Sequence, residues 1–202
     1  MLSDAFGSDF RNHQRSNTAS ESKIISGHNT YRQIRRQWPE HRIFAILREP
    51  KSRLRSEIQH HYARRNEPRY HRLGHIFASM IRDGFHADKY LLGHPAVIAQ
   101  CDNVLVRYLC STVVDNVVTE EHFEQAKANL VDLDEVLLNE RFARDTERLF
   151  KRFGVSRPKV RTENRRRIDH VFEDLPEEMS AFVKFDRQLY EFARRAANSR
   201  DR

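Results

Sequence analysis

Apolar and polar stretches alternate along the chain in a pattern that predicts many helices and few strands. The segment RIFAILR, residues 42–48, is compact, apolar and bounded by polar residues, which is typical of a buried strand. Residues 23–26 (KIIS) are a second strand candidate, and the β-branched residues of 111–118 are a third. The remaining pattern predicts helices over residues 30–37, 50–65, 71–83, 95–109, 120–130, 140–153 and 176–197.

Proline and glycine mark several of these boundaries. Pro39 follows the helix at 30–37 and ends it. Pro50 suits the first position of the next helix, because its missing N–H would have no partner there. Gly154 predicts a helix C-cap that opens a loop over 154–164.

The order of these elements predicts an α/β fold, with a small, mainly parallel sheet covered by helices. We expect a loop or frayed helix at 1–22, where Ser, Asn and Asp are frequent, one domain over 23–197, and a short tail at 198–202. The chain has 202 residues, of which 39% are hydrophobic and 13 are Phe, so it can form a core. A wholly disordered protein is therefore excluded.

The charge balance indicates an anionic partner. The formal net charge is +7, and the 36 basic residues comprise 7 Lys and 29 Arg. A guanidinium group is always charged and binds phosphate or sulfate through two parallel hydrogen bonds. Composition does not choose among nucleic acid, nucleotide, membrane surface and acidic polysaccharide, and a solvated arginine-rich surface is the alternative.

Other classes of protein are disfavoured by what the sequence lacks. Cys101 and Cys110 lie nine residues apart, which would place them on opposite sides of one helix, and they do not make a disulfide framework. The 11 His show no metal-ligand spacing, so we expect no metal. No apolar run has the length of a transmembrane helix or the character of a signal peptide, which favours a cytoplasmic protein as the sequence stands.

The most informative segment is IFAILREPKSRLRS, residues 43–56, which predicts a strand, a short turn and a helix. A helix N-terminus attracts anions, and Arg48 at the carboxyl end of the strand would reach the same crevice. Ser56 lies about 9 Å along the helix from Pro50, so Arg48 and Ser56 can touch one phosphate. In the alternative interpretation, Arg48 pairs with a nearby carboxylate and Ser56 is an ordinary surface residue.

This segment resembles the 3′-phosphate-binding motif of sulfotransferases, which use 3′-phosphoadenosine 5′-phosphosulfate (PAPS). In the Golgi-type carbohydrate family, which includes heparan sulfate 2-O-sulfotransferases, an apolar strand precedes Leu-Arg-Asp-Pro, and a Ser stands eight residues after that Arg. Here the motif reads Leu47-Arg48-Glu49-Pro50 and ends at Ser56, with Glu in place of Asp. By this resemblance, Arg48 and Ser56 would hold the 3′-phosphate of PAPS in a P-loop-NTPase-like fold.

Further segments resemble the family in the same order along the chain, over roughly residues 23–196. They are Ser26-Gly27-His28, the DNVLVRYL segment 102–109, the EVLLNERF segment 135–142 and the DRQLY segment 186–190. The resemblance implies transfer of sulfate from PAPS to a hydroxyl of a carbohydrate or polysaccharide acceptor, with the desulfated cofactor PAP as product.

Two further roles are assigned by this resemblance. His28 is the best candidate for the base, since imidazole titrates near neutral pH; the alternative is a loop histidine. A family loop at the position of 161–167 closes over the nucleotide, which makes Arg161 and Asn164 candidate cofactor ligands; the alternative is a solvated linker.

One part of the family pattern is absent. The loop that binds the 5′-phosphosulfate lies well upstream of the Gly-His segment, and no Lys precedes Lys23 here. We therefore expect an N-terminally truncated domain, or a degenerate homologue that only binds nucleotide or polyanion. A third hypothesis, a basic helical domain that binds nucleic acid, lacks any recognised motif, so no nucleic-acid partner is expected.

A second basic cluster lies between the helices predicted at 50–65 and 71–83. Its members are Arg64, Arg65, Arg69 and Arg72, together with His60, His61, Tyr70 and His71. The cluster can bind an anionic polysaccharide, or it is simply an exposed helix end.

Overall fold

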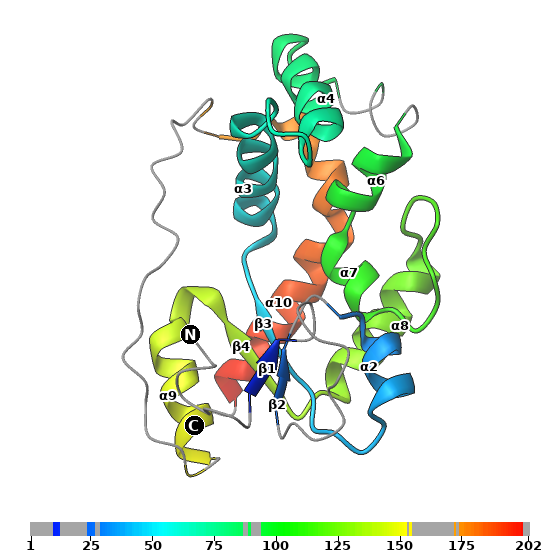
Figure 1. Cartoon of the computed structure of the whole chain (residues 1–202). Coiled ribbons are helices and arrows are strands. Elements are labelled where there is room, and N and C mark those ends of the chain that lie inside the picture. Colours follow the sequence, from blue (N-terminus) through cyan, green and yellow to red (C-terminus); the bar gives the residue numbers. More distant parts are fainter. Residues whose placement is uncertain are drawn as a thin grey trace.

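The computed structural model describes residues 10–12, 24–26, 29–86, 89, 94–152, 154, 172 and 174–199. Helices dominate this part of the chain, and its strands form two parallel pairs (Figure 1). The predicted helix-rich α/β architecture with a small parallel sheet is confirmed at this level.

The strands are short and the helices have intermediate lengths. The strands are β1 (Phe10–Asn12), β2 (Ile24–Ser26), β3 (Phe44–Leu47) and β4 (Glu135–Leu138). The α-helices are α2 (Tyr31–Gln37), α3 (Pro50–Ala63), α4 (His71–Arg82), α6 (Pro95–Cys101), α7 (Val104–Leu109), α8 (Glu120–Val131), α9 (Phe142–Arg152) and α10 (Lys184–Ser199). Two 3₁₀ segments, η2 (Asn139–Arg141) and η3 (Glu177–Val183), precede α9 and α10.

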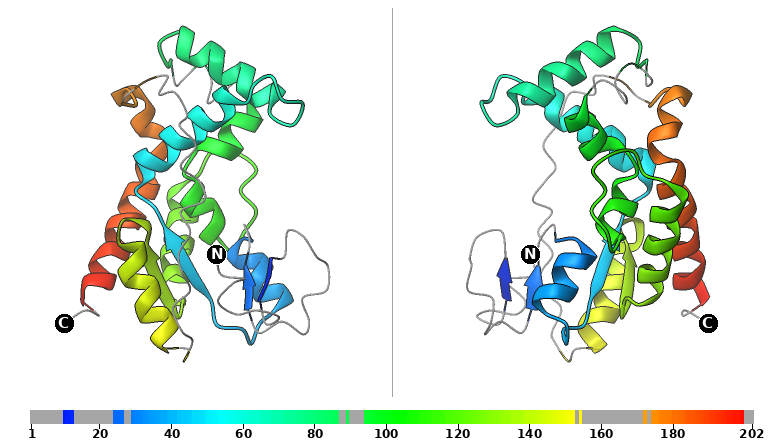
Figure 2. Two further views of the ribbon diagram at one scale, coloured as in Figure 1. Left: turned by 60° about the vertical axis from the view of Figure 1, so that its left-hand side comes forward. Right: turned by 90° about the vertical axis from the view of Figure 1, so that its right-hand side faces the viewer.

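The β3–β4 pair lies within the larger of the two buried clusters. Its register pairs Phe44 with Glu135 and Leu47 with Leu138. Leu47, Val136 and Leu138 belong to one buried cluster, which also includes side chains of α10. Because side chains alternate along a strand, Leu137 faces the other side, and α9 packs against β4. Helices therefore lie on both sides of the pair (Figure 2).

A second buried cluster fills the space between α3, α4, α6 and η3. Leu54, Ile58, Phe77, Met80 and Phe182 lie in it, and none of these side chains is exposed. Since α3 starts directly after β3 and carries this second cluster, the end of β3 lies at the junction of the two cores (Figure 1).

Three local predictions are wrong. The predicted helix 95–109 is two helices, because Asn103 has a left-handed backbone with φ 43° and separates α6 from α7. The predicted strand at 111–118 is an irregular segment, and the guanidinium of Arg107 donates to the carbonyl groups of Val114 and Asn116 within it. Phe10–Asn12, within the expected loop, is a strand parallel to β2.

Candidate functional site

Arg48 follows the last residue of β3 and lies at the carboxyl end of the parallel pair, as the sequence predicts. Its side chain is exposed and makes no hydrogen bond or ion pair with a described residue. The interpretation in which Arg48 pairs with a nearby carboxylate is therefore not realised in the described part of the chain. An unpaired guanidinium at this edge of a parallel sheet is suited to bind an anion.

Glu49, the next residue, occupies the start of α3. Its carboxylate accepts hydrogen bonds from the backbone N–H groups of Lys51 and Ser52, at 3.0 and 2.7 Å. Burial raises the pKa of Glu49, but the hydrogen bonds from Ser52 and Lys51 outweigh it and hold that pKa below its usual value. The amide groups that would attract an external anion are thus satisfied within the chain, by the side chain of Glu49.

Ser56 lies in the second turn of α3 and is half-buried. Like Arg48, its side chain has no hydrogen-bond partner among the described residues. The two predicted phosphate ligands are therefore both available, a guanidinium and a hydroxyl on consecutive elements. The backbone N–H groups at the start of α3 are not available in the same way, because the Glu49 carboxylate accepts from them.

Arg53, which lies in α3 between Arg48 and Ser56, is directed elsewhere. Its Nη2 donates to the carbonyl of Gln100 at 3.2 Å, so it joins α3 to α6. Its Nε atom is buried and has no hydrogen-bond partner among the described residues. Arg53 is therefore a packing residue whose positive charge lies near Glu57 and Asp186; burial is the largest influence on the pKa of both carboxyls, and the charge of Arg53 opposes it.

Two residues missed from the sequence lie close to the start of α3. The Glu140 carboxylate accepts from the backbone N–H of Glu49 at 2.8 Å and from the Tyr190 hydroxyl at 2.8 Å. Burial raises the pKa of Glu140, but these hydrogen bonds outweigh it and the net shift is downward. Burial and the adjacent Glu140 carboxylate raise the pKa of Tyr190. The Glu140 carboxylate thus joins the start of α3 to α10.

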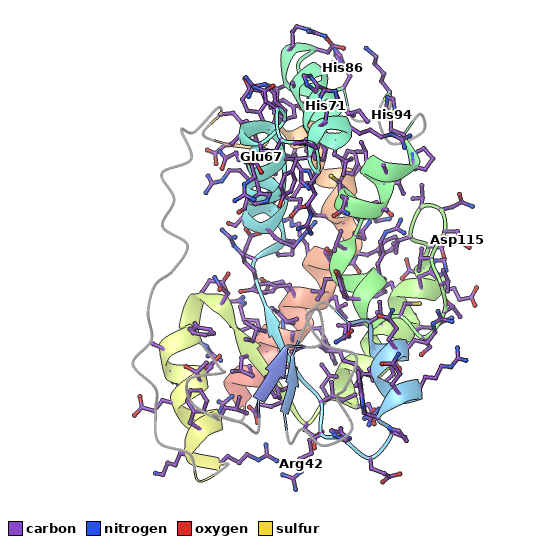
Figure 3. The ribbon with its side chains drawn as sticks, in the orientation of Figure 1. Arg42, Glu67, His71, His86, His94 and Asp115 are labelled. Carbon is purple, nitrogen blue, oxygen red and sulfur yellow. The ribbon has the colours of Figure 1, made fainter. Side chains whose placement is uncertain are left out.

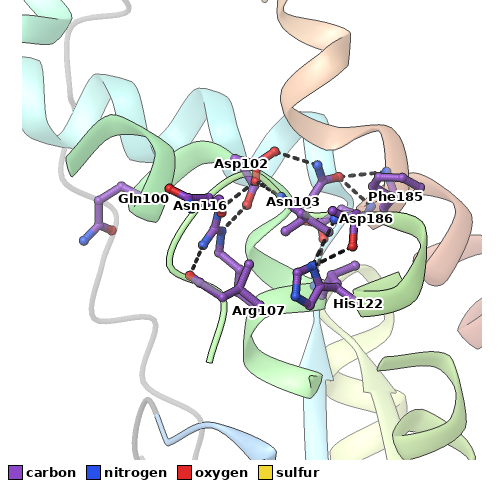
Figure 4. A network of polar contacts seen from close by, with 12 residues as sticks. Gln100, Asp102, Asn103, Arg107, Asn116, His122, Phe185 and Asp186 are labelled. Atoms are coloured by element: carbon purple, nitrogen blue, oxygen red, sulfur yellow. Dashed lines mark hydrogen bonds and ion pairs between the residues drawn. The ribbon is translucent and has the colours of Figure 1, made fainter. Parts of the chain in front are cut away.

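The segments that resemble the family at 102–109 and 186–190 meet in a buried polar network (Figure 4). Asp102 accepts from the Arg107 guanidinium at 2.7 Å and from the backbone N–H of Val118 at 2.8 Å. Asn103 donates to Asp102 at 2.8 Å, and its side-chain oxygen accepts from backbone N–H groups of α10. Asp102, Asn103 and Asp186 are all buried, so this network is a structural junction rather than an accessible site.

The other predicted site residues fall outside the part that the structure describes. His28, Arg161 and Asn164 are among them, so their proposed roles stay predictions. Within the described ranges, no three His, Cys, Asp or Glu side chains gather as metal ligands. No helix in that same part of the chain has the length and apolar character needed to cross a membrane.

The chain was compared with family models, curated proteins and solved structures. No family model, no curated protein and no solved structure matches it. The functional assignment therefore depends on the residues themselves.

Proposed function

We propose that this chain is a sulfotransferase-like domain that binds PAPS and transfers its sulfate to a hydroxyl of a carbohydrate acceptor. The observation that carries the proposal is Arg48, an exposed guanidinium without a described partner, located where a parallel strand leads into a helix. Ser56 supplies a free hydroxyl two turns further on.

In the proposed reaction, this chain's residues bind, orient and move a proton. Arg48 and Ser56 would hold the 3′-phosphate of the donor and so fix the nucleotide against the carboxyl end of β3. His28 would accept the proton of the acceptor hydroxyl. Bound PAPS supplies the activated sulfuryl group.

Nucleotide binding is tested by thermal denaturation with millimolar PAP. A ligand that binds only the native state raises the melting temperature, so we expect a shift with the wild type and none with Arg48→Ala. Arg42→Ala is the matched control, because Arg42 is an exposed arginine at the other end of the same strand (Figure 3). Adenosine 5′-monophosphate, which lacks the 3′-phosphate, should produce a smaller shift. An equal shift in Arg48→Ala and wild type would refute the Arg48 assignment.

Transfer is tested separately by PAP release from PAPS with a panel of carbohydrate acceptors. We expect acceptor-dependent PAP release that His28→Ala abolishes while retaining the PAP-induced thermal shift. A thermal shift without transfer to any acceptor would identify the chain as a homologue that only binds nucleotide.

A further inference from the structure

The second basic cluster lies at the end of α3 opposite to Arg48, where α3 turns into α4. We call residues 60–75 the α3–α4 corner. At a rise of about 1.5 Å per residue, the 14 residues of α3 separate the corner from the end of β3 by roughly 20 Å. The corner lies in the upper part of the view in Figures 1 and 3, at the far end of α3 from β3.

The α3–α4 corner has more basic than acidic groups. Arg69 and Arg72 are exposed and make no ion pair with a described residue. Its acidic side chain, Glu67, lies 3.9 Å from the guanidinium of Arg64. The whole of α4, HRLGHIFASMIR, carries no acidic residue. Two arginines of this corner are therefore available to an external anion.

Aromatic side chains lie next to these charged groups. The guanidinium groups of Arg64 and Arg69 lie 5.1 and 5.7 Å from the centre of the Tyr70 ring. The Arg64 group also donates to the Tyr70 hydroxyl at 3.0 Å. On the adjoining turn of α4, the exposed rings of His71 and His75 lie 4.4 Å apart in an edge-to-face arrangement, at 61° to each other. These contacts restrict the side chains before a ligand arrives, which lowers the entropy lost on binding.

The backbone of the corner is held tightly. A Cβ atom at Gly74 would lie 2.6 Å from Cα of Arg65 and 2.6 Å from the carbonyl oxygen of His61. The glycine therefore lets α4 approach the end of α3 closely. Beneath this contact, Phe77 and Met80 are fully buried against α3. The arginine and aromatic side chains of the corner are thus carried by a tightly packed backbone.

We propose that the α3–α4 corner is a binding surface for single-stranded nucleic acid. Arg69 and Arg72 contact phosphate groups, and the exposed imidazoles of His71 and His75 stack on bases. The exposed aromatic rings of His71 and His75 favour this ligand over a sulfated polysaccharide, which has no aromatic bases to stack on them. They favour it over a lipid surface too, because the apolar side of α4 is used in the core and leaves nothing to insert.

This proposal differs from the expectation of no nucleic-acid partner, which relied on the lack of a recognised motif. Binding by phosphate contacts and stacking depends on the arrangement of charged and planar groups and needs no fixed sequence pattern. Binding at the α3–α4 corner would be additional to the proposed sulfotransferase activity and does not depend on it.

Fluorescence anisotropy with a labelled oligothymidylate of about twelve nucleotides tests the phosphate contacts. The double variant Arg69→Ala/Arg72→Ala should bind at least tenfold more weakly. For this variant, the slope of log affinity against log salt concentration should be less steep than that of the wild type by about 1.4. Each phosphate contact to a single strand contributes about 0.7 to this slope. The control Arg32→Ala/Arg36→Ala removes the same charge from exposed positions of α2 and should change affinity less than twofold. Equal losses in the two double variants would overturn the proposal.

Stacking is tested with the double variant His71→Ala/His75→Ala, measured at pH 8. We expect at least fivefold weaker binding of the oligothymidylate, with unchanged circular dichroism. An abasic oligodeoxyribose phosphate of equal length should bind at least fivefold more weakly than the oligothymidylate. If the abasic strand, heparin or phosphatidylserine vesicles bind as tightly at equal anion concentration, the surface is a general anion site and the proposal is wrong.

Discussion

Asn103 and Asp186 each cap the helix on which the other lies. The Asn103 side-chain oxygen accepts from the backbone N–H groups of Phe185 and Asp186 at 2.7 and 3.1 Å, in the first turn of α10. The Asp186 carboxylate accepts from those of Leu105 and Val106 at 3.0 and 2.9 Å, in the first turn of α7. This exchange joins two helices that are distant in the sequence at a point without access to water (Figure 4).

Replacing Asn103 by glycine should destabilise the protein strongly. Glycine tolerates the left-handed backbone at φ 43°, so the variant isolates the loss of the side-chain hydrogen bonds. Two buried N–H groups of α10 would lose their acceptor, and we expect a loss of about 2–4 kcal/mol. Urea denaturation measures this change. Asn66→Gly, at an exposed position between α3 and α4, is the control and should change stability by less than about 0.5 kcal/mol.

The contribution of Asp186 to stability should depend on pH. Burial raises its pKa to about 6, although the N–H groups of Leu105 and Val106 oppose this shift. The folded state then binds the proton more tightly than the unfolded state, whose Asp pKa is about 3.9. The stability that Asp186 contributes is therefore fully present below about pH 4 and is lost as pH rises through about 6.

The measurement is urea denaturation of wild type and Asp186→Asn between pH 4 and pH 7. Because the other titrating groups are common to both proteins, the difference in unfolding free energy reports on Asp186. We expect wild type to lose stability relative to Asp186→Asn as pH increases. A difference that stays constant would contradict the raised pKa.

Gly74→Ala should destabilise the contact between α3 and α4. Within a helix, this substitution normally stabilises by up to about 1 kcal/mol. Here the new methyl group would lie 2.6 Å from backbone atoms of Arg65 and His61, so α4 has to move away from α3. We expect a net loss of about 1–3 kcal/mol in thermal or urea denaturation. Any gain in stability would mean that the helices separate easily.

Glu49→Asn should increase the affinity for PAP, if Arg48 binds the nucleotide as proposed. Asparagine is a good N-cap, so α3 should keep its first turn while the negative charge beside Arg48 is removed. We expect affinity to rise severalfold in isothermal titration calorimetry, with stability changed by less than about 1 kcal/mol. Glu178→Asn, an exposed acidic residue of η3, should leave PAP affinity unchanged. Weaker binding in Glu49→Asn would show that the carboxylate helps the site.

The sequence predicts elements well where the signal is local. Pro50 and the apolar run before it define the end of β3 and the start of α3, and the structure agrees. The break between α6 and α7 is not predictable in this way. The residues around Asn103 have helical periodicity, and the left-handed turn is stabilised by partners in α10, about 80 residues away.

The candidate site, too, has residues that the local sequence predicts and residues that it does not. The positions of Arg48 and Ser56 could be predicted, because Arg48 directly follows the apolar strand and Ser56 lies in the helix after it. Glu140 and Tyr190 could not be connected to them, because β4 and α10 bring these side chains to Glu49 from distant segments. In Glu49 itself part of the signal was present, since a negatively charged side chain at the N-terminus of a helix is stabilising.

The pairing of β3 with β4 has a consequence for how the chain acquires its fold. Partners in this parallel pair are separated by 91 residues, so the pair closes a long loop before its hydrogen bonds can form. Contacts at such separation slow folding, whereas the neighbouring helices α3 and α4 can associate early. On a ribosome, which synthesises the chain from its N-terminus, α3 and α4 would be complete before β4, the partner strand of β3, has been synthesised.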